Sequence, residues 1–280
     1  MPDPRRLLTT LQRAAQAFRE TPGRTGRVLR LPEGAEVLVV GDIHGNVDNF
    51  RSVFKLADFA NQPRRHLVMQ EVIHGPFAYP DEGGDKSHQM VDLLAALKLK
   101  YPERVHFLLG NHELAQWRKQ RVAKGNVDQN DWFTLGVRTA YGDSAGEILD
   151  RYDDLFAAAE LAIRAPNRVF LSPTVPPKAS TFSLSILEAE VIADSEFRSG
   201  GAAHGIVWGR DVSQANVDDF LDRVDADLLI SGHIPTHDGY IVPNNRQIIL
   251  DSIGTPAGYC LFSTDDRLTQ EQLIAKIGML

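Results

Sequence analysis

The run Gly41-Asp42-Ile43-His44-Gly45-Asn46 puts a carboxylate and an imidazole two residues apart, directly after an apolar, β-branched stretch at residues 37–40. Such a stretch is typical of a strand buried on both faces, and the glycines permit a tight turn after it. A carboxylate and an imidazole in one turn can bind the same cation. Oxygen and nitrogen donors together suit Mn²⁺, Fe or Zn²⁺ better than Ca²⁺.

Two further polar motifs follow apolar stretches in the same way. Gly110-Asn111-His112-Glu113 comes after residues 105–109, and Ser231-Gly232-His233 comes at the end of residues 228–231. Open α/β sheets bind their ligands beyond the carboxyl ends of the strands. We therefore expect the three motifs to meet at one site, although each motif alone is a weak signal.

Together these motifs resemble the calcineurin-like metallophosphoesterase superfamily, within it the branch of bacterial serine/threonine-type protein phosphatases and dinucleoside polyphosphate hydrolases. The resemblance runs from about residue 37 to residue 251 in the family's order. It implies a four-layer α-β-β-α sandwich of two mixed sheets. It also implies two divalent ions, foremost Mn²⁺, that activate water to hydrolyse a phosphate monoester or anhydride in a phosphorylated substrate.

The resemblance assigns roles position by position. Asp42 and His44 match ligands of the first ion, and Asn111 and His233 match ligands of the second. His112 matches the histidine at the leaving-group oxygen, so it would be the general acid.

The chain departs from the family between the first two motifs. The usual Gly-Asp followed by Asp-Arg-Gly reads here Met69-Gln70-Glu71-Val72-Ile73-His74-Gly75-Pro76. Glu71 is the natural substitute for the bridging aspartate, because a carboxylate one methylene longer can still span two cations. His74 takes the position of the second aspartate and Gly75 that of the phosphate-binding arginine. The partner of His112 and one phosphate contact are therefore altered.

A second departure concerns the metal ligands. Pro173 stands where the resemblance expects another histidine, after an expected strand at residues 168–172. A proline side chain has no donor atom, so the second ion loses a ligand unless another residue replaces it. His204, expected on a loop before a strand at residues 206–208, is the nearest replacement; the alternative is a loop histidine without a ligand role.

Two more residues complete the predicted site. Glu113 is expected to orient the backbone turn or His112. Arg210 either supplies the phosphate contact that is missing elsewhere, since guanidinium binds phosphate oxygens bidentately, or is a surface arginine paired with Asp211.

Strand and helix patterns alternate along the chain, which predicts α/β layers. Helices are expected over residues 7–18, 50–59, 89–100 and 269–276, and strands over 37–40, 66–69, 105–109, 168–172, 228–231, 246–250 and 259–263. Residues 114–163 have a mainly helical pattern. We expect a single domain over residues 1–280, in which residues 114–165 form a helical, cap-like insertion.

The composition narrows the possible classes of protein. The 280 residues are 43% hydrophobic and carry a net charge of −7, which disfavours a nucleic-acid partner because such proteins need clustered basic surface. The single cysteine, Cys260, excludes an intrachain disulfide and fits a reducing compartment. No stretch approaches the roughly 20 apolar residues of a membrane-spanning helix. We expect a cytoplasmic protein; its oligomeric state is open.

Two functions from different classes fit these observations. The first is a metal-dependent phosphoesterase, supported by the three motifs. The second is a catalytically impaired member with the same fold that serves as a binding or regulatory protein, supported by Pro173 and Gly75.

Overall fold

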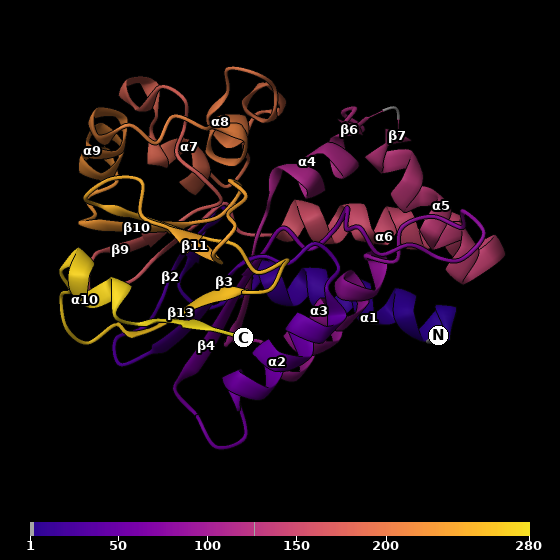
Figure 1. Ribbon diagram of the computed structural model, residues 1–280. Coiled ribbons are helices and arrows are strands. Elements are labelled where there is room, and N and C mark those ends of the chain that lie inside the picture. The colour runs from indigo at the N-terminus through magenta and orange to yellow at the C-terminus, as the bar shows by residue number, and fades with distance from the viewer. Residues whose placement is uncertain (1–2, 126) are drawn as a thin grey trace.

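The computed structural model describes residues 3–125 and 127–280, and two mixed sheets form its centre (Figure 1). The five-stranded sheet has the order β14-β13-β3-β4-β5. Its strands are β3 (Glu36–Asp42), β4 (Arg65–Gln70), β5 (Val105–Leu108), β13 (Gly258–Ser263) and β14 (Ile277–Met279). The strands β3, β4 and β5 are parallel, and β13 pairs antiparallel with both β3 and β14.

The seven-stranded sheet has the order β1-β2-β8-β9-β10-β12-β11. Its strands are β1 (Arg24–Thr25), β2 (Val28–Arg30), β8 (Ala162–Arg164), β9 (Val169–Leu171), β10 (Leu228–Ser231), β11 (Tyr240–Ile241) and β12 (Gln247–Leu250). The central strands β9, β10 and β12 are parallel. A separate two-stranded hairpin joins β6 (Ala123–Lys124) to β7 (Val127–Asp128).

Helices cover the outer faces of the two sheets. In Figure 1, α7, α8 and α9 lie above β9 and β10, and α2 and α3 lie on the side of β3 and β4. The helices are α1 (Pro4–Arg19), α2 (Val47–Ala57), α3 (His88–Lys100), α4 (Asn111–Arg118), α5 (Gln129–Tyr141), α6 (Ala145–Ala158), α7 (Leu184–Glu188), α8 (Ala202–Trp208), α9 (Gln214–Arg223) and α10 (Gln270–Ile274). The predicted sandwich of two mixed sheets with flanking helices is confirmed.

Each central strand is buried on both faces because it contributes to two hydrophobic clusters. In β3, Val37 and Val39 pack between the sheets, whereas Leu38 and Val40 face the helices. Alternation along a strand sends successive side chains to opposite faces. The clusters between the sheets contain Val37, Val39, Val68, Leu108, Val169, Leu171, Leu228, Ile230, Ile248 and Leu250. This two-sided burial is why the strands are continuous apolar runs in the sequence.

The expected elements agree with the structure, with one exception. Residues 206–208 were expected to be a strand, but they end helix α8, so His204 lies on a helix and not on a loop. The apolar, β-branched triplet suggested a strand. The buried residues Ala203, Ile206 and Val207 instead follow the i, i+3, i+4 spacing of a helical face.

The segment at residues 114–165 is mainly helical, as expected, but it also contributes to the body of the fold. Its helix α6 packs against α1, and its last residues form β8 of the seven-stranded sheet. Phe133 of α5 contacts the ring of His74, with centroids 5.8 Å apart. A cap-like role for this segment stays a prediction.

A buried lysine lies beneath the five-stranded sheet. Lys98 of α3 is fully buried, and its Nζ donates to Thr21 Oγ1 at 2.7 Å and to the Val105 carbonyl at 2.9 Å. The same Nζ lies 4.4 Å from the centroid of the Phe18 ring. Burial lowers the pKa of Lys98 from 10.5 to about 8. The unfolded chain therefore binds more protons than the folded chain between these two values.

We expect Lys98→Met to flatten the pH dependence of stability. In the native chain, the free energy of unfolding should rise by up to about 3 kcal/mol from pH 8 to pH 10.5. The reason is that Lys98 loses its proton in the folded chain over this range, while the same lysine in the unfolded chain is still protonated. Urea unfolding at several pH values measures this rise. Lys100→Met, at an exposed position of the same helix, should keep it. Equal pH dependence in the Lys98→Met and native proteins would contradict the expectation.

Candidate metal centre and active site

The site forms where strands from both sheets end. Asp42 is the last residue of β3, and Glu71 directly follows β4. Asn111 begins α4 just after β5, and His233 lies two residues beyond β10. The register between β3 and β4 shifts after Val39, so that Asp42 pairs with Gln70. The four strand ends thereby bring residues nearly 200 positions apart into contact, as in the hydrogen bond from His233 to Asp42.

Four residues of the site have a left-handed backbone conformation. The φ angles are 40° at His44, 40° at Glu71, 60° at His74 and 67° at His233. This conformation is uncommon for residues other than glycine and persists only where the surrounding structure enforces it. The fold therefore directs these four side chains into the site at a conformational cost.

The two oxygens of Glu71 face two different groups of donors. Its Oε1 lies 3.3 Å from His233 Nδ1, which in turn lies 2.9 Å from Asn111 Oδ1. Its Oε2 lies 3.6 Å from His44 Nε2. Ligand atoms of His44, Glu71 and His112 all lie within 4.8 Å of one another. The carboxylate of Glu71 is thus positioned between two groups of potential ligands.

Asp42 connects the first motif to the last. The backbone N–H of His233 donates to its Oδ1 at 3.0 Å and its Oδ2 at 2.9 Å. The glycine before His233 is required for this contact. A Cβ on Gly232 would lie 2.2 Å from Asp42 Oδ1 and 2.3 Å from Gln70 Nε2.

The charges at the site fit a bound cation. Burial, followed by repulsion from Glu71, raises the pKa of Asp42, and burial also raises the pKa of Glu71. Among the described residues, no lysine or arginine forms an ion pair with either carboxylate. Burial and Arg210 lower the pKa of His233 to about 4, so this imidazole is neutral, the form that binds metal ions. Although burial opposes them, Glu71 and Asp42 raise the pKa of His44. Two buried carboxylates next to imidazole and amide donors are a suitable environment for a divalent ion.

A chain of hydrogen bonds runs behind His112. His112 Nδ1 lies 2.9 Å from His74 Nδ1, and His74 Nε2 lies 3.4 Å from Gln116 Oε1. Burial lowers the pKa of His74 to about 3, so its ring is neutral and carries one proton. Because an amide oxygen only accepts, that proton lies on Nε2. His74 Nδ1 then accepts a hydrogen bond from His112 Nδ1, which leaves His112 Nε2 directed away from this chain.

Glu113 ties together the turns that follow β4 and β5. Its buried carboxylate accepts hydrogen bonds from the backbone N–H groups of Val72 at 2.8 Å, Ile73 at 3.0 Å and Gly110 at 3.1 Å. Burial, then repulsion from Glu71, raises the pKa of Glu113 to about 7. Its geometry is that of a residue that holds the backbone on which Glu71 and Asn111 are carried.

Two predicted residues lie outside the cluster of donors. His204 stacks on Trp208 with ring centroids 5.8 Å apart, and the ring of Trp208 in turn contacts that of His233, with centroids 6.3 Å apart. Arg210 is exposed, yet it is near enough to lower the pKa values of Glu71 and His233. The predicted alternative, an ion pair with Asp211, is not among the ion pairs of the described residues.

The structure shows the surroundings of both departures from the family and gives a reason for the glycine. Pro173 is buried, and its carbonyl accepts a hydrogen bond at 3.0 Å from the N–H of Gly232. Gly75 packs so closely on the first motif that a Cβ would lie 1.9 Å from the carbonyl oxygen of His44. Any side chain at position 75 would therefore displace the turn that carries His44.

Gln70 belongs to the site but was not among the predicted residues. Its side chain is buried, and neither amide atom has a hydrogen-bond partner among residues 3–125 and 127–280. Buried polar atoms without partners are rare and costly, so the amide of Gln70 is a further polar group available to the site. A polar residue directly after the apolar run Leu67-Val68-Met69 was the available signal.

Comparison with known proteins identifies the family. Residues 35–237 match the family model described as calcineurin-like phosphoesterase. The chain belongs to this family. Its members are hydrolases that generally use divalent metal ions, in agreement with the donors described above.

Several known phosphatases resemble the chain. A probable serine/threonine-protein phosphatase of Encephalitozoon cuniculi is 27% identical over 241 residues, which cover 79% of this chain and 47% of that protein. The PP2A-like serine/threonine-protein phosphatase PPG1 of Candida albicans is 23% identical over 250 residues, which cover 82% and 54%. The chain thus spans about half the length of the curated relatives it matches.

Solved structures share the fold. A serine/threonine phosphatase of Saccharomyces cerevisiae, with similarity to human phosphatase PP5, has a TM-score of 0.69 at 16% identity, covering 93% of this chain and 82% of that one. A cold-active protein-tyrosine phosphatase of a Shewanella species has a TM-score of 0.56 at 14% identity, covering 88% and 79%. At these identities the likeness concerns the fold alone. No helix among the described residues is both long enough and apolar enough to cross a membrane.

We expect Glu113→Ala to lower the free energy of unfolding by about 2–4 kcal/mol, because it leaves three backbone donors without an acceptor in a buried position. Urea unfolding of metal-free protein measures the change. Glu147→Ala, at an exposed position of α6, should change it by less than about 0.5 kcal/mol. Similar values for both variants would show that the three hydrogen bonds contribute little.

Proposed function

We propose that this chain is a metal-dependent phosphoesterase that hydrolyses a phosphate monoester or anhydride by attack of water. One observation carries the proposal: the two oxygens of Glu71 face separate groups of donors, with His233 on one side and His44 on the other. A phosphorylated substrate is supported by the phosphatase names of the relatives. The net charge of −7 disfavours a nucleic-acid substrate, and the single cysteine supports a cytoplasmic location.

The residues would hold two divalent ions, with Glu71 between them. Asp42 and His44 would bind the first ion, and Asn111 and His233 the second. When bound, the ions lower the pKa of a water molecule and neutralise charge on the phosphoryl group. The mixture of carboxylate, amide and imidazole donors favours Mn²⁺, with Fe or Zn²⁺ as alternatives. This arrangement does not use His204, whose ring stacks on Trp208.

His112 would act as the general acid. In its doubly protonated form it gives the Nε2 proton to the leaving oxygen, and it keeps the Nδ1 proton in the hydrogen bond to His74. Gln116 holds His74 in the tautomer that accepts this bond. Glu113 keeps the turns after β4 and β5 in place. Arg210, at the exposed rim, would bind a phosphoryl oxygen, a contact that Gly75 cannot make.

The second candidate is a catalytically impaired member of the family that acts as a binding or regulatory protein. Pro173 supports it, because a ligand is missing from the second group of donors and His204 does not join that group. Three donors remain there, namely Glu71, Asn111 and His233.

We expect Mn²⁺-dependent turnover of a chromogenic phosphomonoester and loss of about 100-fold or more of kcat/KM in Asp42→Asn. The loss follows because Asp42 supplies a carboxylate that an amide cannot replace as a charged ligand. Asp48→Asn, the same change at an exposed side chain, should keep full activity. Absence of metal-dependent turnover across a panel of monoesters, diesters and anhydrides would count against catalysis.

The variant Pro173→His separates the two candidates. If the chain is an active enzyme, calorimetric titration of the native protein with Mn²⁺ should already give two bound ions. The variant should then change the affinity of the second ion without creating activity. If instead the variant gains both a second ion and turnover that the native protein lacks, the impaired-enzyme reading is correct.

We expect His74→Leu to lower kcat by about 10–100-fold while Mn²⁺ affinity stays within about twofold, because the variant removes the acceptor that orients His112 without removing a ligand. His74→Asn should recover much of the activity, since its Oδ1 can accept the same hydrogen bond. Equal loss in the Leu and Asn variants would mean that His74 contributes only packing against Phe133.

A further inference from the structure

A cavity of about 480 Å³ lies at the end of α4 opposite the metal centre. It is formed by the last residue of α1, the hairpin of β1 and β2, the last turn of α4 and residues 189–192. Arginines and apolar groups dominate its lining: Arg19, Arg24, Arg27, Trp117, Val191, Ile192 and Phe197. None of these residues belongs to the site described above.

Arg27 is the buried arginine in the lining of this cavity. Its residue exposure is 7%, and its guanidinium lies 5.4 Å from the ring centroid of Trp117 and 5.5 Å from that of Phe197. Its Nε donates to the Ala159 carbonyl at 2.7 Å and its Nη2 to the Phe156 carbonyl at 2.8 Å. Its Nη1 has no hydrogen-bond partner in the described part of the chain. These carbonyl groups accept hydrogen bonds from the guanidinium of Arg27, but they carry no net charge that could neutralise it.

Cations outnumber anions around Arg27. Burial, followed by repulsion from Arg24, lowers the pKa of Arg27 to about 9; Arg19 and Arg118 lower it further, whereas Glu160 raises it. Glu160 is fully buried and lies 3.8 Å from Arg24 Nη1. The same carboxylate also acts on Lys98. One buried carboxylate therefore interacts with three buried cations, namely Arg24, Arg27 and Lys98.

The remaining charges near the cavity do not remove the excess. Arg118 and Arg198 both pair with Asp194, and Glu190 lies in the lining. Arg19 is exposed and donates to the carbonyl of Asp154 at 3.2 Å. A buried guanidinium without a carboxylate partner is costly, so binding of an anion next to it would be favourable.

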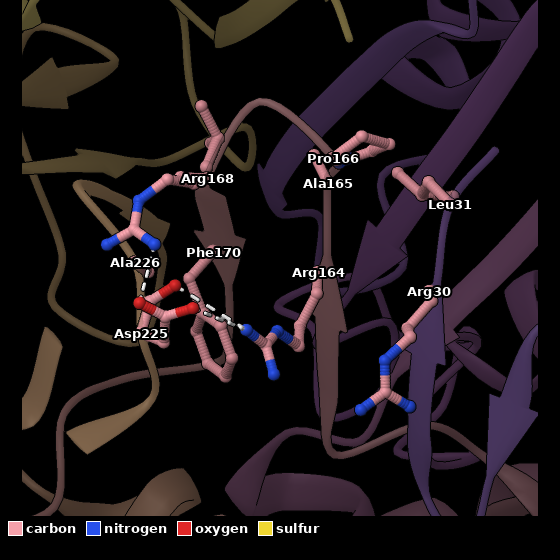
Figure 2. Close-up of a pocket in the computed structure, with 10 residues that line it drawn as sticks. Arg30, Leu31, Arg164, Ala165, Pro166, Arg168, Phe170, Asp225 and Ala226 are labelled. Atoms are coloured by element: carbon pink, nitrogen blue, oxygen red, sulfur yellow. Dashed lines mark hydrogen bonds and ion pairs between the residues drawn. The ribbon is translucent and has the colours of Figure 1, made fainter. Parts of the chain in front are cut away.

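A second arginine-lined cavity provides the contrast (Figure 2). Figure 2 shows Arg164 and Arg168 directed at the same carboxylate, Asp225. Arg168 also binds Asp227 at 2.8 Å, and Arg30 binds Glu188 at 2.6 Å. Each guanidinium there has a carboxylate partner. In the cavity around Arg27, by contrast, Arg24 has a carboxylate partner, but Arg19 and Arg27 have none among the described ion pairs.

We propose that the cavity around Arg27 binds a small organic phosphate. Phosphate oxygens match the fork of a guanidinium and would supply negative charge to Arg19 and Arg27, neither of which has an ion-pair partner in the described part of the chain. The volume exceeds that of a phosphate ion, and Trp117, Val191 and Phe197 offer apolar contact to an attached organic group. The site is independent of the metal centre and of the proposed activity.

Isothermal titration with phenylphosphonate, which cannot be hydrolysed, tests the proposal. The protein is kept in EDTA and carries Asp42→Asn, so that the metal centre cannot bind the probe. We expect one bound molecule per chain. Arg19→Gln should weaken binding about tenfold or more by removing a charged donor, and Val191→Glu should do the same by adding a carboxylate at a position that is 82% exposed. Both positions lie at the surface, so folding should be preserved.

Arg30→Gln is the matched control, because it removes a guanidinium from the compensated cavity. It should leave the affinity within about twofold of the parent protein. The proposal is overturned if the metal-free protein does not bind phenylphosphonate. It is equally overturned if Arg19→Gln and Val191→Glu bind as tightly as Arg30→Gln.

Discussion

The burial of two neighbouring carboxylates, Asp42 and Glu71, is the constraint on which the site depends. Each is nearly inaccessible to solvent, burial raises the pKa of each, and each is fixed by the backbone at the end of a strand. Imidazole and amide groups surround them, and no ion pair with lysine or arginine relieves them in the described residues. Such an arrangement is favourable only when positive charge lies between the carboxylates.

The strand order and strand directions of the sandwich make this arrangement possible. β3 and β4 are parallel neighbours, so their carboxyl ends bring Asp42 and Glu71 to one edge. β10 belongs to the other sheet, and its end delivers His233 across the interface between the sheets. Apolar side chains between the sheets set the distance between them. The small space left by Gly232 then lets the backbone of His233 reach the carboxylate of Asp42.

The altered positions of this chain are adapted to one another. Gly75 carries no side chain because the carbonyl of His44 occupies that space. His74 presents a neutral nitrogen to His112, and Gln116 determines which nitrogen that is. A neutral partner orients His112 without adding a further negative charge near Asp42 and Glu71. At the other end of α4, cations are in excess around the buried Arg27, and the proposed phosphate would balance their charge.

The sequence by itself determined the alternating strands and helices and the central strands, because periodicity is a local pattern. Its strand-end motifs, through their resemblance to a known family, predicted Asp42, Glu71, Asn111 and His233 as metal ligands, and the structure brings these four residues into contact. The sequence did not determine that residues 206–208 are helical, since three apolar residues fit either a strand or a helix until their neighbours are known. Nor did it find Gln70 or the shortage of anions around Arg27. Both depend on which distant groups share a buried space, and only the packed tertiary structure decides that.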